Sequence, residues 1–347
     1  MDYERYQRHF SLIGIDGQTK LSQASVLIVG CGGVGSPVSL YLTAAGIGRI
    51  GLIDHDVVDL SNLQRQILFN ENDLNKSKVL SAEAHLKALN SEIDINTCVE
   101  RLDQTVAEKL FPEYDLIIDG SDNFQTRYLV NDICCQLNKP FISASVLKTQ
   151  AQIGFFDIKS GCYRCLFPDA PPSELIPNCA EAGVLGSIVG VIGTMAATLA
   201  LNYFIKDSYP SNAIKIFDSE TLSIKNLSYA KSSDCVSCVQ KKYIPLCANK
   251  HGLGASRIIK KSQVSADNYY IVDVREHWER SLGHIEFDHL HLPKSQVNSY
   301  LSSLHKNTKI LCYCKSGMRS QQVVDVLLKN GFDAYSLKGG YTEWVSS

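Results

Sequence analysis

The sequence of 347 residues predicts an α/β protein with two domains: a larger one built on a doubly wound parallel sheet, and a smaller α/β domain after it. Short apolar runs alternate with helical stretches from residue 26 to residue 142, an order typical of parallel sheets. A second such series begins near Tyr269, after a stretch rich in Lys, Gly, Pro and Ser. We therefore expect domains over residues 1–240 and 262–347, joined by a linker over 241–261.

The individual elements follow from apolar runs and the residues that end them. Residues 26–29 (Val-Leu-Ile-Val) end in glycines and residues 116–118 (Leu-Ile-Ile) end in Asp119, as buried parallel strands do. The other strands expected in this sheet are 50–53 and 141–142, and the expected helices are 36–45, 76–89 and 128–137. Segments 152–158, 214–217 and 222–228 are expected to be antiparallel strands. In the second domain we expect strands over 269–273 and 309–313 and a helix near 319–329.

Composition limits the class of protein. Hydrophobic residues make up 45% and charged residues 20%, which is ordinary for a globular chain. The net charge of −2 gives no bulk attraction to nucleic acid or to an anionic membrane, so we expect neither as a direct partner. The polar N-terminus lacks the apolar core of a signal peptide, which predicts a cytoplasmic protein. In that reducing compartment, twelve cysteines favour metal binding or catalysis over disulfides.

One segment resembles a membrane span. Residues 185–205 carry no charge and are long enough to cross a bilayer. The segment contains three glycines and several Ser, Thr and Asn residues, and no other segment looks similar. A close-packed helix in the core or at a subunit interface explains it better.

Residues 30–35 (Gly-Cys-Gly-Gly-Val-Gly) follow a strand and open a helix. The four glycines Gly30, Gly32, Gly33 and Gly35 permit a tight turn in which backbone N–H groups approach phosphates at a helix N-terminus. Asp54 ends the next strand, where a carboxylate accepts hydrogen bonds from ribose hydroxyls. This pattern alone fits NAD and ATP equally well, and a simple tight turn is the plain alternative.

A polar set after the following strands favours ATP. It consists of Ser61, Asn62, Arg65, Lys78, Asp122 and Asn123. Two cations and a carboxylate suit a triphosphate and its Mg²⁺, because charge neutralisation dominates nucleotidyl transfer. An NAD-dependent dehydrogenase would need no such set. The alternative is that these residues form surface salt bridges.

Five motifs together resemble the MoeB/ThiF activating enzymes, relatives of the ubiquitin-activating enzymes. They are residues 5–8 (Arg-Tyr-Gln-Arg), 30–35, 53–56 (Ile-Asp-His-Asp), 61–66 (Ser-Asn-Leu-Gln-Arg-Gln) and 121–127 (Ser-Asp-Asn-Phe-Gln-Thr-Arg). The resemblance covers about residues 3–240. It implies a Rossmann-like fold that adenylates the terminal glycine carboxylate of a small carrier protein and releases pyrophosphate.

The resemblance also implies residue roles. The glycine loop and Asp54 would hold ATP. Asn62, Arg65 and Lys78 would contact the nucleotide and its phosphates, and Asp122 would support Mg²⁺. Arg8 would reach the phosphates from the other subunit of a homodimer.

Cysteines occur as two Cys-x-x-Cys pairs, Cys162/Cys165 and Cys235/Cys238. Four thiolates in two such pairs suit tetrahedral Zn²⁺ without an open position, which is a structural site. Redox-active dithiols and unpaired buried cysteines are the alternatives. The same two pairs occur in the MoeB/ThiF family, and that resemblance favours zinc.

Cys179 lies between these pairs, in a segment that resembles the crossover loop of the family. In some relatives a cysteine here forms a thioester or an acyl-persulfide link with the carrier, so we expect Cys179 to act as a nucleophile. The alternative is a small residue that packs at the start of the long apolar helix.

The second domain resembles a rhodanese over about residues 262–347. The resemblance rests on residues 271–276 (Ile-Val-Asp-Val-Arg-Glu), 283–285 (Gly-His-Ile), 311–320 and 337–344. Cys314 follows a strand and precedes a helix, so the backbone N–H groups of residues 315–319 can surround its sulfur and stabilise a thiolate or a persulfide. Arg319 is expected to add positive charge, and Asp273 and Arg275 to be structural partners.

Together these features predict an enzyme that adenylates a ubiquitin-like sulfur-carrier protein (MoaD/ThiS-like) and converts its terminus to a thiocarboxylate. Cys314 would carry sulfur from a donor such as a cysteine desulfurase. One alternative is a conjugating enzyme that uses a Cys179 thioester to modify lysines. Another is a non-catalytic scaffold that binds both carrier and donor.

Overall fold

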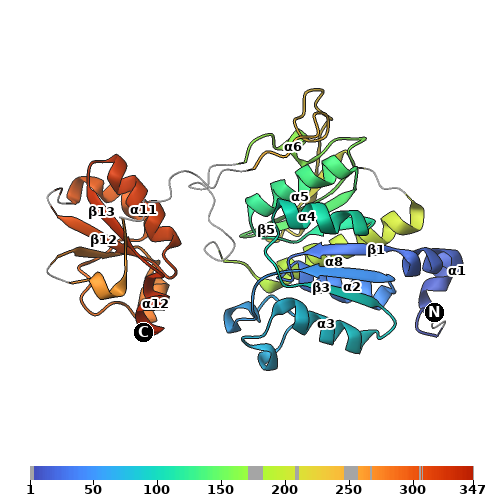
Figure 1. Cartoon of the computed structure of the whole chain (residues 1–347), viewed down its shortest axis with the longest axis horizontal. Coiled ribbons are helices and arrows are strands. Elements are labelled where there is room, and N and C mark those ends of the chain that lie inside the picture. Colours follow the sequence, from blue (N-terminus) through green and yellow to red (C-terminus); the bar gives the residue numbers. More distant parts are fainter. Residues whose placement is uncertain are drawn as a thin grey trace. The chain divides into compact units, whose positions relative to one another are not determined.

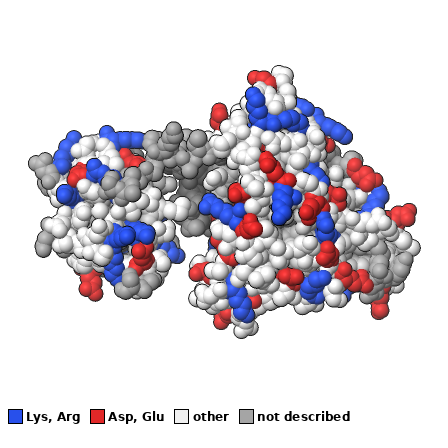
Figure 2. Space-filling view, viewed as in Figure 1, with Lys and Arg blue, Asp and Glu red and all other residues white. Residues whose placement is uncertain are grey.

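The computed structural model describes residues 4–170, 183–207, 211–245, 257–265, 268–304, 306 and 308–346. The chain forms two compact units, residues 1–246 and 247–347. On the face of the molecule in Figure 2, basic and acidic side chains are interspersed over the first unit, in keeping with the net charge of −2.

An eight-stranded sheet forms the centre of the first unit, in the order β3-β2-β1-β4-β5-β6-β7-β8. Neighbours among the first five pair in parallel: β3 (Asp94–Cys98), β2 (Arg49–Ile53), β1 (Ser25–Val29), β4 (Leu116–Asp119) and β5 (Phe141–Leu147). The last three extend it antiparallel: β6 (Gln150–Phe156), β7 (Ala213–Asp218) and β8 (Ser223–Ser228). The predicted doubly wound sheet and its antiparallel extension are confirmed.

Helices cover both faces of this sheet (Figure 1). One face carries α1 (Gln7–Gln23), α2 (Gly35–Ala45), α3 (Lys78–Leu89) and α8 (Gly186–Lys206), and the other carries α4 (Gln104–Leu110) and α5 (Phe124–Leu137). Short helical turns are η1 (Leu60–Asn62), η2 (Glu71–Asp73), η3 (Phe111–Glu113) and α6 (Tyr163–Leu166). Because strand side chains alternate, Val26 and Ile28 pack in the first layer and Leu27 and Val29 in the second.

Helix α8 is, within the described residues, the one helix long and apolar enough to span a membrane. It packs against α2, α1, β5 and β6. A Cβ atom at Gly193 would lie 2.3 Å from Cγ of Pro37 and 2.8 Å from the carbonyl oxygen of Val34. The helix therefore packs into the first unit's core, which is one of the two places that the sequence analysis left open.

The second unit contains a five-stranded parallel sheet in the order β11-β10-β12-β13-β9. Its strands are β9 (Ile258–Ile259), β10 (Tyr270–Asp273), β11 (Leu290–His291), β12 (Lys309–Tyr313) and β13 (Asp333–Leu337). Its helices are α9 (His277–Ser281), α10 (Val297–Tyr300), α11 (Met318–Lys329) and α12 (Gly340–Ser346), with short turns η5 (Lys261–Gln263), η6 (Lys294–Gln296) and η7 (Leu301–Ser303). This is the second α/β domain expected from the sequence.

Some boundaries differ from the sequence prediction for local reasons. Helix α5 begins at Phe124 rather than 128, because the side chain of Asn123 accepts a hydrogen bond from the Thr126 amide at 2.8 Å and caps the helix there. Strand β5 continues past residue 142 to Leu147, because antiparallel pairing with β6 extends it.

Two glycines of α8 provide a matched test of its packing. We expect Gly193→Ala to lower the free energy of unfolding by about 1–3 kcal/mol, because the added methyl group overlaps Pro37 and Val34. A Cβ at Gly190 meets nothing within 4 Å, so Gly190→Ala should be neutral or stabilising by up to about 1 kcal/mol through helix propensity. Urea unfolding followed by circular dichroism measures both, and equal losses would contradict this account of the packing.

Candidate functional site

A cavity of about 290 Å³ lies at the carboxyl ends of the parallel strands of the first unit. Many of the residues predicted for nucleotide binding line it: Gly30, Gly32, Gly33, Asp54, Arg65, Lys78, Asp122 and Asn123. Within the described part of the chain, the lining does not include Gly35, Ser61, Asn62 or Arg8. Strands β1, β2 and β4 bring together side chains from three separate loops, as the parallel topology requires.

The glycine loop is closed tightly between β1 and α2. Gly30 has φ of +90°, and a Cβ at Gly35 would lie 2.0 Å from the carbonyl oxygen of Gly30. Only glycine fits at Gly35, so the chain can turn directly from β1 into α2 beside the cavity. The N-terminus of α2 favours negative charge at this point.

Four charged side chains of the cavity, those of Asp54, Asp56, Arg65 and Lys78, are paired with one another or with the backbone. Asp54 accepts hydrogen bonds from the amides of Cys31 at 2.8 Å and Asp56 at 2.9 Å. The Lys78 ammonium group, on a side chain 6% exposed, donates to Asp56 at 2.9 Å. Arg65 donates to the carbonyl oxygen of Ser61 at 3.0 Å, so Ser61 positions a cavity residue although it lies outside the lining.

The cavity also contains residues that the sequence analysis did not select as site residues. Gln66 is buried, and its Oε1 atom has no hydrogen-bond partner within the described residues. A buried amide oxygen without a partner is costly, which suits a group that meets a ligand. Glu100, Arg101 and Leu102 line the cavity from the loop after β3. They belong to no motif, and only their position after a parallel strand could have indicated them.

The four predicted zinc ligands come together, although Cys165 and Cys235 are 70 residues apart in the chain. Their Sγ atoms all lie within 4.8 Å of one another, and the pairs Cys162–Cys235 and Cys165–Cys238 are each 3.5 Å apart. A tetrahedron with Zn–S bonds of about 2.3 Å has S···S edges of about 3.8 Å. The donor set and its spacing therefore fit a zinc ion.

A fifth thiol borders this cluster. Cys135, on α5, is buried against the set and shares a hydrogen bond with Cys162. That hydrogen bond, together with burial among other sulfur atoms, raises the pKa of Cys162 well above its usual range. A bound cation would reverse this shift, because it stabilises the thiolate. Cys179, the other cysteine singled out in this domain, lies outside the described residues.

In the second unit, Cys314 sits at the end of β12 with its side chain almost fully buried. Its Sγ accepts a hydrogen bond from the Gly317 amide at 3.2 Å, and the Ser320 hydroxyl lies 3.7 Å from it. Gly340 (φ +58°) approaches so closely that a Cβ would lie 2.2 Å from the carbonyl oxygen of Cys314. The amide of Tyr341 donates to that same oxygen at 2.7 Å. The loop of residues 314–320, which we call the cysteine cradle, therefore places one backbone amide and one hydroxyl at the sulfur.

The positive charge expected from Arg319 is already paired. Its guanidinium donates two hydrogen bonds to the Glu279 carboxylate, at 2.5 and 2.6 Å, and both side chains are largely buried. Burial works to raise the pKa of Glu279, but the hydrogen bonds from Arg319 and the Glu276 amide outweigh it, so the net pKa lies below the usual value. Arg319 thus fixes the end of the cradle to α9.

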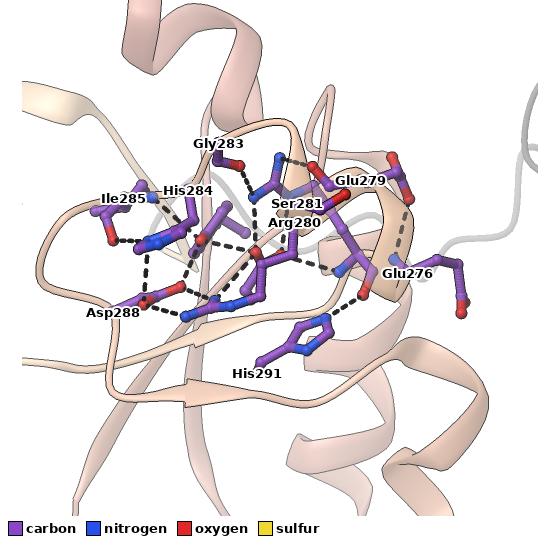
Figure 3. A network of polar contacts seen from close by, with 12 residues as sticks. Glu276, Glu279, Arg280, Ser281, Gly283, His284, Ile285, Asp288 and His291 are labelled. Atoms are coloured by element: carbon purple, nitrogen blue, oxygen red, sulfur yellow. Dashed lines mark hydrogen bonds and ion pairs between the residues drawn. The ribbon is translucent and has the colours of Figure 1, made fainter.

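A polar network links α9 to the segment from Gly283 to His291 (Figure 3), and Tyr313 connects this network to the start of the cradle. Asp273 accepts hydrogen bonds from Arg275 at 2.7 and 2.9 Å and from the Tyr313 hydroxyl at 2.9 Å. The Tyr313 hydroxyl also lies 2.7 Å from Asp288, which pairs with Arg280. Because Tyr313 directly precedes Cys314, the network holds one end of the cradle and Arg319 holds the other. The predicted structural role of Asp273 and Arg275 agrees with these contacts.

This geometry defines a class of protein: a Rossmann-like nucleotide-binding domain with a four-cysteine cluster, followed by a domain with a cysteine cradle. The chain belongs to the ThiF family, which it matches over residues 3–237, and residues 256–347 match the rhodanese-like domain. The family resemblance and the fold class inferred from the sequence are confirmed.

Several curated proteins and solved structures are similar to this chain over most of its first unit or over its whole length. The chain is 36% identical to the probable adenylyltransferase/sulfurtransferase MoeZ of Mycobacterium tuberculosis, over 98% of this chain and 92% of that protein. It is 45% identical to the adenylyltransferase and sulfurtransferase MOCS3 of Culex quinquefasciatus, over 67% of this chain but only 55% of that protein. Among solved structures, E. coli MccB with ATP is similar, with a TM-score of 0.59 and 29% identity over 67% of this chain and 73% of that one.

The lowered pKa of Glu279 predicts how the second unit responds to acid. Because the folded pKa lies below the unfolded value of about 4.3, the Glu279–Arg319 pair stabilises fully above that pH, and its contribution is lost as the pH falls through the folded pKa. Glu279→Gln should therefore lower the unfolding midpoint most at pH 7, with the difference from wild type shrinking toward pH 3.

Tryptophan fluorescence measures this in the intact chain, because both tryptophans, Trp278 and Trp344, belong to the second unit. Glu286→Gln, which neutralises an exposed carboxylate of the same unit, is the matched control and should have no effect at any pH. If Glu279→Gln lowered the unfolding midpoint by the same amount at every pH, the loss of stability would not come from the ion pair.

Proposed function

We propose that this chain uses ATP to adenylate the C-terminal glycine of a ubiquitin-like sulfur-carrier protein and then converts that terminus to a thiocarboxylate through a persulfide on Cys314. One observation carries the proposal: a single ThiF-family chain contains both a cavity lined by a glycine loop and cations, and a rhodanese-like domain whose loop retains Cys314. Relatives that align over most of this chain have names combining adenylyltransferase and sulfurtransferase activities.

In the first stage the glycine loop and Asp54 would hold ATP, and Arg65 and Lys78 would neutralise its phosphates. A Mg²⁺ ion held near Asp122 would supply further neutralising charge at the phosphates. Attack of the carrier carboxylate on the α-phosphate would form an acyl-adenylate and release pyrophosphate. The unpartnered Gln66 amide oxygen and the solved structure of MccB with ATP support a nucleotide in this cavity.

In the second stage the terminal sulfur of the Cys314 persulfide would attack the activated carbonyl, displace AMP and leave an acyl-disulfide. A thiolate, for which Cys179 is our candidate, would then attack Sγ of Cys314. That step forms a new disulfide and releases the carrier thiocarboxylate. Because the two domains belong to one chain, the persulfide would be present at a high effective concentration near the acyl-adenylate. A dithiol reductant would then reduce the new disulfide and restore the Cys314 thiolate, which would take up a new sulfur from a persulfide donor such as a cysteine desulfurase.

We further propose that the active form is a homodimer in the cytoplasm, in which Arg8 serves the cavity of the other subunit. Arg8 is exposed on α1 and is absent from the described lining of its own chain's cavity. On the same helix, Leu12 and Ile15 are 87% and 53% exposed. Apolar side chains that another subunit covers in a dimer would be exposed in this way in a single chain.

Intact-mass spectrometry tests the complete proposal. The enzyme is incubated with a candidate carrier ending in Gly-Gly, Mg-ATP and a persulfide donor. We expect the carrier to gain one sulfur in place of one oxygen. Cys314→Ala should abolish this gain while carrier-dependent ATP–pyrophosphate exchange continues, and Cys98→Ser, which changes a cysteine outside every motif, should alter neither. Exchange without sulfur gain in wild type would leave an adenylating enzyme whose rhodanese domain serves another acceptor.

The cavity residues have a separate prediction. Arg65→Ala and Lys78→Ala should each lower the rate of ATP–pyrophosphate exchange by about 10²–10³-fold, because each removes a charge that stabilises the transition state. Loading of Cys314 with sulfur should be unchanged in both variants. If the exchange rate were unaffected, the assigned phosphate-binding roles would be wrong.

A further inference from the structure

One buried carboxylate contacts both halves of the cysteine cluster. Asp132, fully buried on α5, accepts hydrogen bonds at 2.8 Å from Nε and from Nη2 of Arg164, one on each carboxylate oxygen. Its Oδ1 also accepts from the Ser237 hydroxyl at 2.5 Å. Arg164 lies between Cys162 and Cys165, and Ser237 lies between Cys235 and Cys238. The same side chain is therefore bonded to the middle of each Cys-x-x-Cys pair.

Further hydrogen bonds complete the arrangement. Asp132 accepts from the Ile244 amide at 3.1 Å and from the Asn131 side chain at 2.8 Å. Asn131 in turn accepts from the Tyr163 amide, inside the first pair, at 2.8 Å. Arg164 donates to the carbonyl oxygen of Ile244 at 3.0 Å, just beyond the second pair. None of these bonds involves a sulfur atom, so both cysteine pairs are tied to α5 by contacts that need no metal.

We propose that Asp132 is the positioning residue of the metal site: it brings the two cysteine pairs together before zinc binds and holds them when zinc leaves. Closing the long loop between Cys165 and Cys235 has an entropic cost. The hydrogen bonds from Arg164 and Ser237 to Asp132 would offset that cost, so the metal would bind to four sulfur atoms that already lie together. Partners outside the ligand set typically change metal affinity 10–100-fold.

The inference rests on assignment of the four cysteines to zinc and is independent of catalysis. The test uses the full-length chain and measures zinc content by elemental analysis and zinc release to a colorimetric chelator. The visible spectrum of the Co²⁺-substituted protein reports tetrahedral thiolate geometry. We expect one zinc per wild-type chain and 10–100-fold faster release from Asp132→Asn, which keeps the shape but loses the charge. The Co²⁺ spectrum of this variant should be altered or weaker.

Asp115→Asn is the matched control. Asp115 is an exposed carboxylate of the same unit that accepts hydrogen bonds from the amide and hydroxyl of Ser25, at 2.9 and 2.6 Å, so it controls for the Asp→Asn change itself away from the cysteines. It should release zinc at the wild-type rate. Equal release from Asp132→Asn and wild type, or equally fast release from both Asp variants, would overturn the proposal.

Ser237→Ala keeps the test decisive if Asp132→Asn does not fold, because it removes one hydrogen bond and retains the Arg164 ion pair. We expect several-fold faster zinc release from this variant, and a wild-type rate would contradict the role of Asp132. A wild-type chain without zinc would overturn both this proposal and the metal assignment. These zinc measurements do not bear on the adenylation and sulfur-transfer proposals, which are tested by ATP–pyrophosphate exchange and by the mass of the carrier.

Discussion

Parallel pairing of β1 with β2 and β4 is the constraint on which the nucleotide cavity depends. Parallel strands deliver their carboxyl ends to one edge of the sheet, so the loops that follow them have to meet there. Gly30, Asp54 and Asp122 are distant in sequence and become neighbours of one cavity for this reason alone. The close approach of Gly35 to the carbonyl oxygen of Gly30 then brings the start of α2 to the same edge.

Helix α5 connects the two polar centres of the first unit. Its N-cap, Asn123, lines the cavity, and its later turns carry Asp132 and Cys135 beside the cysteine cluster. The cysteine cluster therefore lies beside the C-terminal half of α5, whose N-terminus borders the cavity. In the second unit the cysteine cradle depends in a comparable way on α9, through Glu279 and Arg319. In both units a buried charge pair fixes a short cysteine-containing segment to a helix.

Much of this could be predicted from the sequence, because strand periodicity, glycine spacing and paired cysteines are local signals. The sequence placed β1, β2 and β4 within a residue or so and selected the cavity's glycines and charges. It could not reveal that Ser61 and Asn62 stand outside the cavity lining, that Arg319 is neutralised, or that Asp132 bonds both cysteine pairs. The last two facts depend on contacts between residues 32 to 105 positions apart. Helix α1 and strand β3 also escaped prediction, since both are half-exposed and carry weak apolar patterns.

The order of strands in the second unit has a consequence for how such proteins arise. Strand β9, the first of the unit, pairs with β13, the last, and Lys261 beside β9 donates to the carbonyl oxygen of Trp344 at 2.5 Å near the C-terminus. The chain consequently enters and leaves this unit at one edge of its sheet. A module whose ends meet in this way can be joined to an unrelated protein through one connection without rearranging its interior. Fusion at either end of this unit, or its insertion into a surface loop of another protein, would therefore leave its sheet intact.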